Sequence, residues 1–194
     1  MSKKPPSPAV LIGRGVCREM FKHQALVMVP NTSWTGHECD VLVVTRELKL
    51  VDVEIKMSFA DLKRDQGKDK WWKGAEWLPG GRERREWPPK VWKHWYVVSE
   101  SAWCEGAAMM CSASNSSGFA IFCDGSGLVQ SFKGRGAATL HIARNPKPNR
   151  EAKPIGAAEA IDIARLASIR LWEEYMKQGN EPKVARVRHV LDKA

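Results

Sequence analysis

The chain has 194 residues, of which 43% are hydrophobic and 27% charged, so it is long enough for one globular domain and short for two. Lys and Arg number 31 against 22 Asp and Glu, a formal net charge of +9 that favours a polyanionic partner. Five Cys without a C-x-x-C pair argue against a secreted disulfide scaffold and a zinc ribbon, and they indicate a reducing, cytoplasmic compartment. No run of about 18 apolar residues occurs and the Lys- and Pro-rich start lacks an apolar stretch, so neither a membrane span nor a secretory signal is expected.

The positive charge is distributed unevenly along the chain. Residues 1–22, 58–95 and 133–194 carry net charges of +4, +4 and +6, whereas residues 23–57 and 96–132 carry −2 and −3. A single basic segment is as often a solvated face as a binding surface. Three of them flanking two apolar, slightly acidic stretches favour a sheet surrounded by a polyanion-binding surface.

The first predicted elements are a helix and a strand. A Ser-Pro cap followed by apolar residues at helical spacing predicts a helix over residues 8–22. Glu19 falls seven residues after Ile12 and so returns to the inward face, where a carboxylate is costly unless it meets a cation or a polar cleft. A strand is expected at residues 25–29, with a turn over 30–36.

Two Val-rich segments, residues 38–45 and 50–57, predict a hairpin with its turn centred near Glu47. In that register, residues whose numbers sum to 94 lie opposite each other, so Asp40 faces Glu54. Side chains alternate across a strand. The expected buried face is Cys39, Val41, Val43, Val51, Val53 and Ile55, and the expected polar face is Glu38, Asp40, Asp52, Glu54 and Lys56.

The remaining elements follow the same rules. Ser58 and Asp61 form a capping arrangement for a helix that ends near Gly67. Strands are expected at residues 94–99 and, as a second hairpin, at 119–123 and 128–132. A long amphipathic helix ending at residues 179–180 is predicted from the apolar set Ile161, Ala164, Ser168, Leu171, Trp172 and Tyr175.

An aromatic and basic segment at about residues 68–92 separates the predicted strands, and residues 68–95 contain six of the nine Trp. Aromatic rings interleaved with cations are surfaces on which unpaired bases stack. The alternative is that Trp fills a core or a dimer interface, and we favour it for Trp92 and Trp95. The residues expected to bind nucleic acid are Lys63, Arg64, Lys70, Trp71, Trp72, Lys73, Arg82, Arg84 and Arg85.

The facing carboxylates of Asp40 and Glu54 would repel each other unless a cation lies between them. Carboxylate oxygens without a paired His or Cys favour Mg²⁺ or Mn²⁺ over zinc. Lys56 lies on the same face, where it could orient a water or stabilise negative charge on a phosphoryl oxygen. The plainer alternative is a half-exposed hairpin with an acidic solvent face, on which Lys56 pairs with Glu38.

The order of these parts resembles the PD-(D/E)XK nuclease superfamily. The resemblance implies an α/β fold, a restriction-endonuclease-like αβββαβ core with a central mixed sheet flanked by helices. It would occupy residues 1–150 and leave 151–194 as a C-terminal helical extension. The resemblance also implies the site residues: Asp40 and Glu54 as metal ligands, Ile55 as a backbone-carbonyl ligand, Lys56 as the catalytic cation and Glu19 as a fourth ligand.

The run Val-Glu-Ile-Lys-Met-Ser at residues 53–58, followed by Asp61, Asp65 and the pair Lys70-Trp71, is more narrowly similar to the MmcB-like DNA repair branch of that superfamily. The sequence departs from the superfamily pattern in having Cys39 in place of the eponymous Pro. We interpret Asp61 and Asp65 as a helix cap and a surface charge.

The expected function is therefore a Mg²⁺- or Mn²⁺-dependent nuclease that acts on DNA in repair, recombination or restriction. Whether it works as a homodimer is left open. The alternatives are a non-catalytic nucleic-acid-binding protein of the same fold and, third, an assembly subunit whose exposed Trp residues meet a protein partner.

Overall fold

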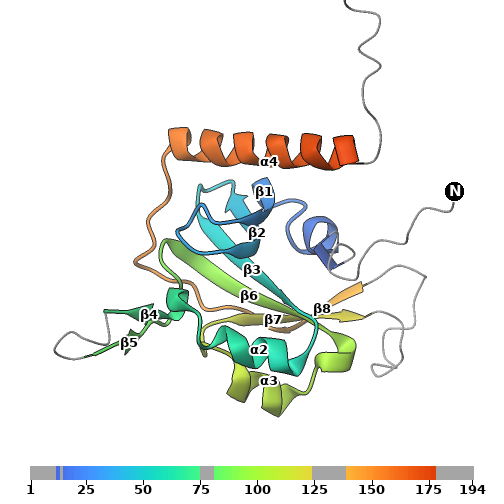
Figure 1. Cartoon of the computed structure of the whole chain (residues 1–194), viewed down its shortest axis with the longest axis vertical. Coiled ribbons are helices and arrows are strands. Elements are labelled where there is room, and N and C mark those ends of the chain that lie inside the picture. Colours follow the sequence, from blue (N-terminus) through green and yellow to red (C-terminus); the bar gives the residue numbers. More distant parts are fainter. Residues whose placement is uncertain (1–11, 14, 75–80, 124–138, 178–194) are drawn as a thin grey trace, which may run out of the picture.

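A six-stranded mixed sheet, in the order β1-β2-β3-β6-β7-β8, forms the centre of the protein (Figure 1). The computed structural model describes residues 12–13, 15–74, 81–123 and 139–177. Neighbouring strands are antiparallel except for β3 with β6 and β6 with β7, which are parallel. The strands are β1 (Ala25–Thr32), β2 (Cys39–Thr45), β3 (Leu50–Lys56), β6 (Val91–Ser99), β7 (Gly118–Cys123) and β8 (Thr139–Arg144).

Helices cover both faces of this sheet. The short elements β4 (Trp72–Lys73) and β5 (Glu83–Arg84) pair in an arm outside it. A π-helical turn, η1, packs on the face formed by Val41, Val53 and Val97, whereas α2, α3 and α4 pack on the opposite face. The helical elements are η1 (Val16–Met20), α2 (Phe59–Asp65), η2 (Asp69–Trp71), η3 (Glu100–Ala102), α3 (Glu105–Cys111) and α4 (Ala157–Lys177).

The predicted hairpin is confirmed in position and register. Val41 pairs with Val53, Leu42 with Asp52 and Val43 with Val51, so the paired numbers sum to 94. In the connecting turn, Leu48 N donates a hydrogen bond to Thr45 O at 2.9 Å, and Lys49 N donates one to the Thr45 hydroxyl at 3.1 Å. After β3 the chain crosses through α2 to the parallel strand β6. The cap predicted for α2 is present, because Ser58 Oγ accepts a hydrogen bond from Asp61 N at 3.2 Å.

The predicted strands differ from the observed ones in two places. β1 continues through Pro30 to Thr32, because an edge strand needs no partner for the missing N–H, and the turn starts only at Ser33. The strand expected at residues 119–123 is confirmed as β7, but its antiparallel neighbour in the described part of the chain is β8, which was not predicted. The partner predicted for it, residues 128–132, lies outside the described residues.

The long C-terminal helix is confirmed as α4, but its buried face was predicted wrongly. Ala160 and Ile163 are the buried positions, and they complete an apolar cluster with Ile155 and β1–β3 residues. The small Ala160 allows the helix to approach the sheet closely. The segment from Ile155 to Ala167 therefore completes the core. Among the described helices, none is both long and apolar enough to cross a membrane.

Candidate functional site

The side of β3 that faces α2 carries a buried cluster of charged side chains. Asp52, Glu54 and Lys56 occupy alternate positions of the strand, and their relative exposures are 0%, 0% and 3%. Asp65, at the end of α2, and Lys70, in η2, are buried against them, whereas the Lys68 side chain is 42% exposed. Three carboxylates and three ammonium groups therefore share one interior site. We call these six residues the ionic cluster.

Glu54 lies at the centre of the ionic cluster. Its Oε2 accepts from Lys56 Nζ at 2.7 Å and from Lys68 Nζ at 3.0 Å, and its Oε1 contacts Lys70 Nζ. Lys70 also lies 3.1 Å from Asp52 Oδ2 and so bridges two successive carboxylates of the same strand face. Both oxygens of Glu54 are thus neutralised by ammonium groups.

Asp65 was interpreted as a surface charge, and this interpretation is wrong. Its Oδ1 lies 3.1 Å from Lys56 Nζ and 3.0 Å from Lys68 Nζ, while its Oδ2 accepts from the Trp71 indole at 3.0 Å and the Tyr96 hydroxyl at 2.6 Å. The α2 helix ends at this residue, so its carboxylate turns back toward β3 instead of into solvent. The sequence signal for it was the run Asp65, Lys68, Lys70 directly after the E-x-K motif.

Asp40 lies beside this cluster at the start of β2. Its Oδ2 accepts from the backbone N of Ile55 at 2.6 Å, which fixes the carboxylate at the end of the hairpin. Among the described residues, no basic group is within ion-pair distance of Asp40. Burial and the negative charge of Glu54 raise the pKa of Asp40 above its usual range. Asp40 is thus the one carboxylate here that lacks a direct counter-charge among the parts of the chain that the structure describes.

The carboxylates and ammonium groups of the ionic cluster stabilise each other's charged forms. Burial alone would raise the pKa of Asp52, Glu54 and Asp65, but the neighbouring lysines outweigh it and lower all three. Burial likewise opposes the charged forms of Lys68 and Lys70, yet the carboxylates raise their pKa values above the usual range. These five groups are therefore ionised near neutral pH.

A second polar group adjoins Asp52 on the side away from Glu54. The ligand atoms of His37, Cys39 and Asp52 lie within 4.8 Å of one another, and His94 Nε2 is 3.8 Å from Asp52 Oδ2. We assign no metal to this group, because Lys70 already neutralises Asp52 and burial raises the pKa of the Cys39 thiol, which stays protonated. Cys39, the first residue of β2, was expected on the apolar face; strand alternation fails there because the preceding turn holds its thiol beside Thr35.

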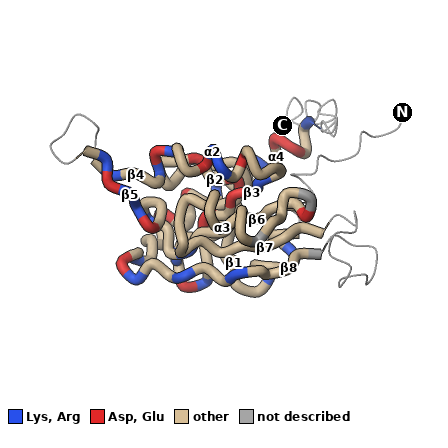
Figure 2. The backbone as a smooth tube through the Cα atoms, turned by 90° about the horizontal axis from the view of Figure 1, so that it is seen from below, with Lys and Arg blue, Asp and Glu red and all other residues tan. Residues whose placement is uncertain are grey.

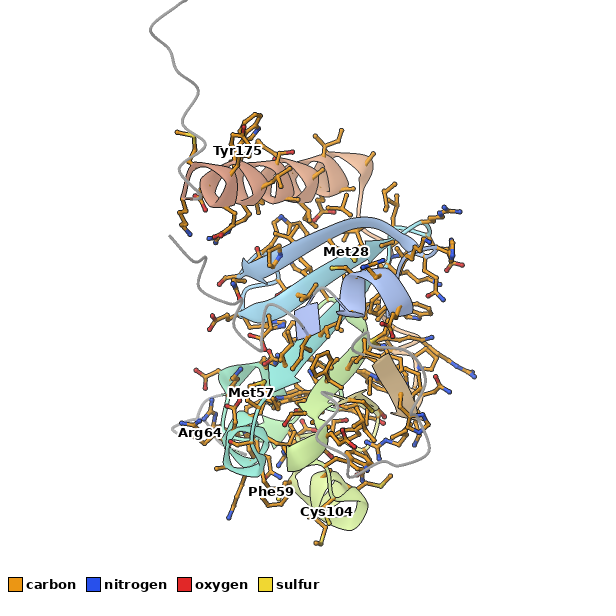
Figure 3. The ribbon with its side chains drawn as sticks, turned by 90° about the vertical axis from the view of Figure 1, so that its right-hand side faces the viewer. Met28, Met57, Phe59, Arg64, Cys104 and Tyr175 are labelled. Carbon is orange, nitrogen blue, oxygen red and sulfur yellow. The ribbon has the colours of Figure 1, made fainter. Side chains whose placement is uncertain are left out.

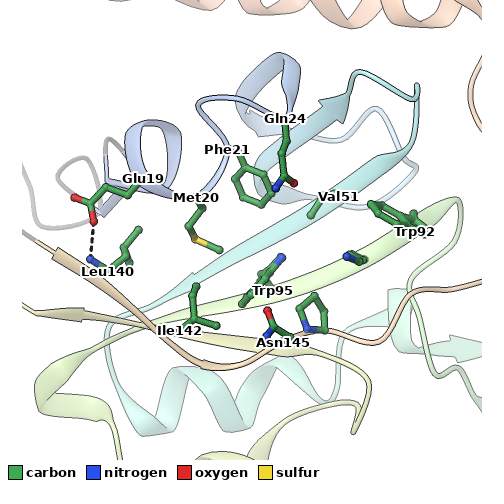
Figure 4. A pocket seen from close by; sticks show the side chains of 12 residues that line it. Glu19, Met20, Phe21, Gln24, Val51, Trp92, Trp95, Leu140, Ile142 and Asn145 are labelled. Carbon is green, nitrogen blue, oxygen red and sulfur yellow. Dashed lines mark hydrogen bonds between the residues drawn. The ribbon is translucent and has the colours of Figure 1, made fainter.

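One of the predicted metal ligands, Glu19, is not placed as expected. Glu19 lies on the other side of the sheet, beside a cavity of about 300 Å³, where its Oε2 accepts from Leu140 N at 2.9 Å (Figure 4). A π turn takes more residues per turn than the α-helix assumed in the prediction, so Glu19 loses its phase with Ile12 and is exposed. Ile55 donates its N–H to Asp40, and its side chain packs on the apolar face, as predicted. The role of its carbonyl oxygen as a metal ligand stays a prediction.

The predicted nucleic-acid-binding residues divide into two groups. Lys70 and Trp71 are buried at 4% and 0%, because they belong to the ionic cluster and its packing, so neither contacts a ligand at the surface and both predictions are wrong. Lys63, Arg64, Trp72 and Arg84 instead line a shallow groove over α2 that ends at Gly67, next to Lys68. Arg64 lies on the outer side of α2 in Figure 3.

Trp72 forms the aromatic floor of this groove. The guanidinium groups of Arg82 and Arg84 lie 5.7 and 5.3 Å from its ring centre. Charges of both signs occur along the β4–β5 arm (Figure 2). Lys73 is paired with Glu83 at 2.8 Å and Arg82 with Asp69, while Arg84 donates to the carbonyl of Ala113 and Arg85 to that of Trp72. Trp95, by contrast, is in the core as favoured.

Comparisons with known proteins give a fold relative and no function. No family model and no curated protein sequence matches the chain. One solved structure, the SPO1766 protein of unknown function from Silicibacter pomeroyi, matches with a TM-score of 0.53 and 15% sequence identity. The match covers 93% of this chain and 99% of that chain. The chain therefore shares an α/β fold, a central mixed sheet flanked by helices, with that protein.

Proposed function

We propose that this protein is a metal-dependent nuclease of the PD-(D/E)XK type that hydrolyses DNA phosphodiester bonds. The observation that carries the proposal is the convergence of Asp40, Glu54 and Lys56 at one end of the β2–β3 hairpin. Lys56 lies 2.7 Å from Glu54, and Glu54 is near enough to raise the pKa of Asp40. Perturbed carboxylates gathered beside a buried lysine are typical of catalytic sites.

The topology around these residues supports the same proposal. Strands β1 to β3 form an antiparallel meander, α2 crosses over, and β6 returns parallel to β3. The crossover places the start of α2 directly after the E-x-K motif, and Asp65 then faces Lys56. This is the order of parts that the sequence resemblance implies for the superfamily core.

The charges around Asp40 fit a divalent cation. Asp40 has no counter-ion among the described residues, and Glu54 is the nearest carboxylate that affects it. A Mg²⁺ or Mn²⁺ ion held by Asp40 and Glu54 would relieve that repulsion. Such an ion would lower the pKa of a bound water and neutralise charge on the phosphoryl oxygens.

Lys68 is the group that such an ion would displace. It contacts Glu54 Oε2 from the solvent side, and its side chain is 42% exposed, whereas Lys56 and Lys70 are enclosed. A lysine with this exposure can turn into water at low cost, because a partly exposed ion pair contributes little. Its departure would leave one lone pair of Glu54 Oε2 for the cation, while Lys56 keeps its hydrogen bond to the same oxygen.

Lys56 and the groove over α2 have separable roles in this proposal. Lys56 Nζ donates to Glu54 and lies 3.1 Å from Asp65 Oδ1, which leaves an N–H for a water inside the site. At 3% exposure its ammonium group would act on a phosphate through such a water and not by direct contact. Lys63, Arg64 and Arg84 bind the phosphate backbone without regard to sequence. An unpaired base would stack on Trp72.

The test is cleavage of supercoiled, linear duplex and single-stranded DNA by the full chain in EDTA, Mg²⁺ or Mn²⁺. Asp40→Asn and Glu54→Gln should each lower turnover at least about 10³-fold, roughly 4 kcal/mol, while DNA binding is kept. Asp61→Asn, the same chemical change on a half-buried capping residue outside the cluster, is the matched control and should leave turnover unchanged. Equal cutting by Glu54→Gln and the wild type would refute the site.

A second candidate function is a non-catalytic DNA-binding protein of the same fold. The observation that favours it is the complete neutralisation of Glu54 by three lysines, which leaves no oxygen free for a metal unless Lys68 moves. It predicts salt-sensitive DNA binding without cleavage, and no heat of Mn²⁺ binding that depends on Asp40. The nuclease predicts both signals.

A further inference from the structure

Helix α4 has a second apolar face that the described residues leave uncovered. Ala160 and Ile163 point into the core, whereas Ile161, Leu171 and Trp172 are 68%, 70% and 63% exposed. Figure 3 shows Tyr175 projecting from the side of α4 that faces away from the sheet. Single exposed apolar residues are ordinary, but a contiguous row of them on one helix marks an interaction surface.

The spacing of this row is that of a helix that packs on another helix. Positions 161, 164, 168, 171 and 175 alternate steps of three and four residues, as a and d positions of a heptad do. Trp172 widens the row on one side. The row is therefore a seam for a partner helix rather than a pocket for a small ligand.

We propose that the partner helix is α4 of a second copy of this chain, packed antiparallel about a two-fold axis at Ser168. In that arrangement residues whose numbers sum to 336 lie level with each other. Ala164 then lies opposite Trp172 of the partner subunit and Ile161 opposite Tyr175 of the partner subunit. The small Ala164 thus meets a large indole ring, Ile161 meets a phenol ring, and Ser168 meets itself at the centre. A seam whose two halves fit each other is the requirement of an isologous dimer.

The charges beside the seam support the same orientation. Arg165 lies beside the seam on the same side as Trp172, and in the antiparallel pair it comes level with Leu171 of the partner subunit and next to Trp172 of the partner subunit. An arginine beside an indole ring is favourable. In a parallel, in-register pair, Arg165 would lie level with Arg165 instead. Glu173 points away from the seam and pairs with Arg170 of its own helix at 3.6 Å.

The exposed area suits a weak dimer. The exposed apolar part of the row is on the order of 500 Å² per copy, so the pair would bury about 1,000 Å². That is the lower limit for a specific interface, and the dimer should therefore dissociate on dilution.

Sedimentation equilibrium of the full chain over a range of concentrations tests the proposal. Trp172→Glu should weaken dimerisation at least about 100-fold, because the charge is buried twice in a symmetric interface. Met110→Glu places the same charge on an apolar residue of α3 that is 79% exposed, and it should leave the dimer unchanged. A wild type that stays monomeric at all concentrations, or equal dimerisation by Trp172→Glu, would overturn the proposal.

Cysteine cross-linking tests the orientation. Ser168→Cys should form an intermolecular disulfide on oxidation, because the two-fold axis brings its two copies together. Ala164→Cys should not, because an antiparallel pair separates its two copies by about 12 Å along the axis, beyond the reach of a disulfide. The wild type, with its five cysteines, gives the background. Cross-linking of Ala164→Cys as efficient as that of Ser168→Cys would overturn the antiparallel arrangement. Neither measurement involves DNA cleavage.

Discussion

The two faces of β3 are buried to the same degree and are built from opposite chemistry. Val51 and Val53 are 1% and 0% exposed in an apolar cluster beneath η1, and Asp52 and Glu54, both 0% exposed, lie in the ionic cluster beneath α2. Successive side chains of a strand point to opposite faces, so the valines lie on one face of β3 and the carboxylates on the other. The same backbone therefore supports a core that needs no partner groups and one in which every charge depends on a partner.

This difference bears on why the ionic face exists. Replacing a buried ion network with apolar side chains of similar volume often leaves stability unchanged or raises it. A chain under selection for stability alone would thus gain nothing from charges at Asp52, Glu54 and Lys56. Charges on the strand that carries the E-x-K motif are what the proposed nuclease site would require.

Replacing one buried side chain on each face of β3 tests whether the two faces differ in this way. Lys70→Met should lower the free energy of unfolding by about 3–5 kcal/mol, because Asp52 and Glu54 are left buried without that ammonium group. Val53→Ala, which only opens a small cavity on the apolar face, should cost about 2 kcal/mol. Urea denaturation of both variants measures these values. If Lys70→Met were no less stable than Val53→Ala, the two faces would not differ in their dependence on partners.

Acid pH should destabilise the ionic face before Asp52, Glu54 and Asp65 are protonated. Burial lowers the pKa of His94, next to Asp52, to about 4, so the folded state holds this ring neutral while the unfolded chain protonates it near its usual value. Stability is then complete above about pH 6.5 and falls as the pH decreases toward 4. Between pH 7 and pH 5 the loss should be about 2 kcal/mol.

His94→Phe, which keeps an aromatic ring between Trp71 and Tyr96, should flatten this part of the pH profile. The measurement is the free energy of unfolding of both proteins at pH 7, 6 and 5. Asp52, Glu54 and Asp65 contribute in a lower window, because their pKa values are depressed and their stabilisation is lost only as the pH falls below about 4. A wild-type profile as flat as that of the variant would contradict the assignment to His94.

Sequence patterns within a few residues were sufficient to predict the apolar face of β3 and the register of the hairpin. The Val-rich strands, the short turn and the alternation of side chains placed Val41 opposite Val53 and Asp40 beside the end of β3. The Ser58 cap and the core position of Trp95 also followed from nearest neighbours in the sequence. Such features depend on interactions within a few residues or across one strand pair.

The ionic face depends on tertiary contacts that the sequence pattern does not encode. The sequence predicted Asp65 as a surface charge and Lys70 as a nucleic-acid-binding residue, but α2 and η2 fold over β3 and bury both. Trp71 read as an exposed stacking ring because its neighbours are polar, yet its indole donates to Asp65 in the interior. Helix α4 has two apolar faces, and only one of them packs on the sheet. Sequence periodicity identified the other one, which the described residues leave exposed.

Lys68 differs from the other two lysines of the ionic cluster in being partly exposed. Lys68→Met should cost less than about 1 kcal/mol of stability, because its side chain is 42% exposed and Lys56 bridges the same two carboxylates. If Lys68 competes with a cation for Glu54, the same variant should bind Mn²⁺ several-fold more tightly in calorimetric titration. Asp40→Asn should remove that binding in either background. Unchanged Mn²⁺ affinity in Lys68→Met would show that Lys68 does not cover the metal position.

The smallest effect is expected at the surface groove, where charges are solvated and act one at a time. Arg84→Ala removes one cation beside Trp72 without touching the ionic cluster, so DNA affinity at physiological salt should fall only a few-fold. The slope of log affinity against log salt should decrease by about 1, because one fewer counterion is released. Arg18→Ala, an exposed arginine on η1 across the sheet, is the matched control and should leave the slope unchanged. Equal slopes in Arg84→Ala and the wild type would place the DNA away from α2, and the groove would then have no part in holding the strand near Lys56.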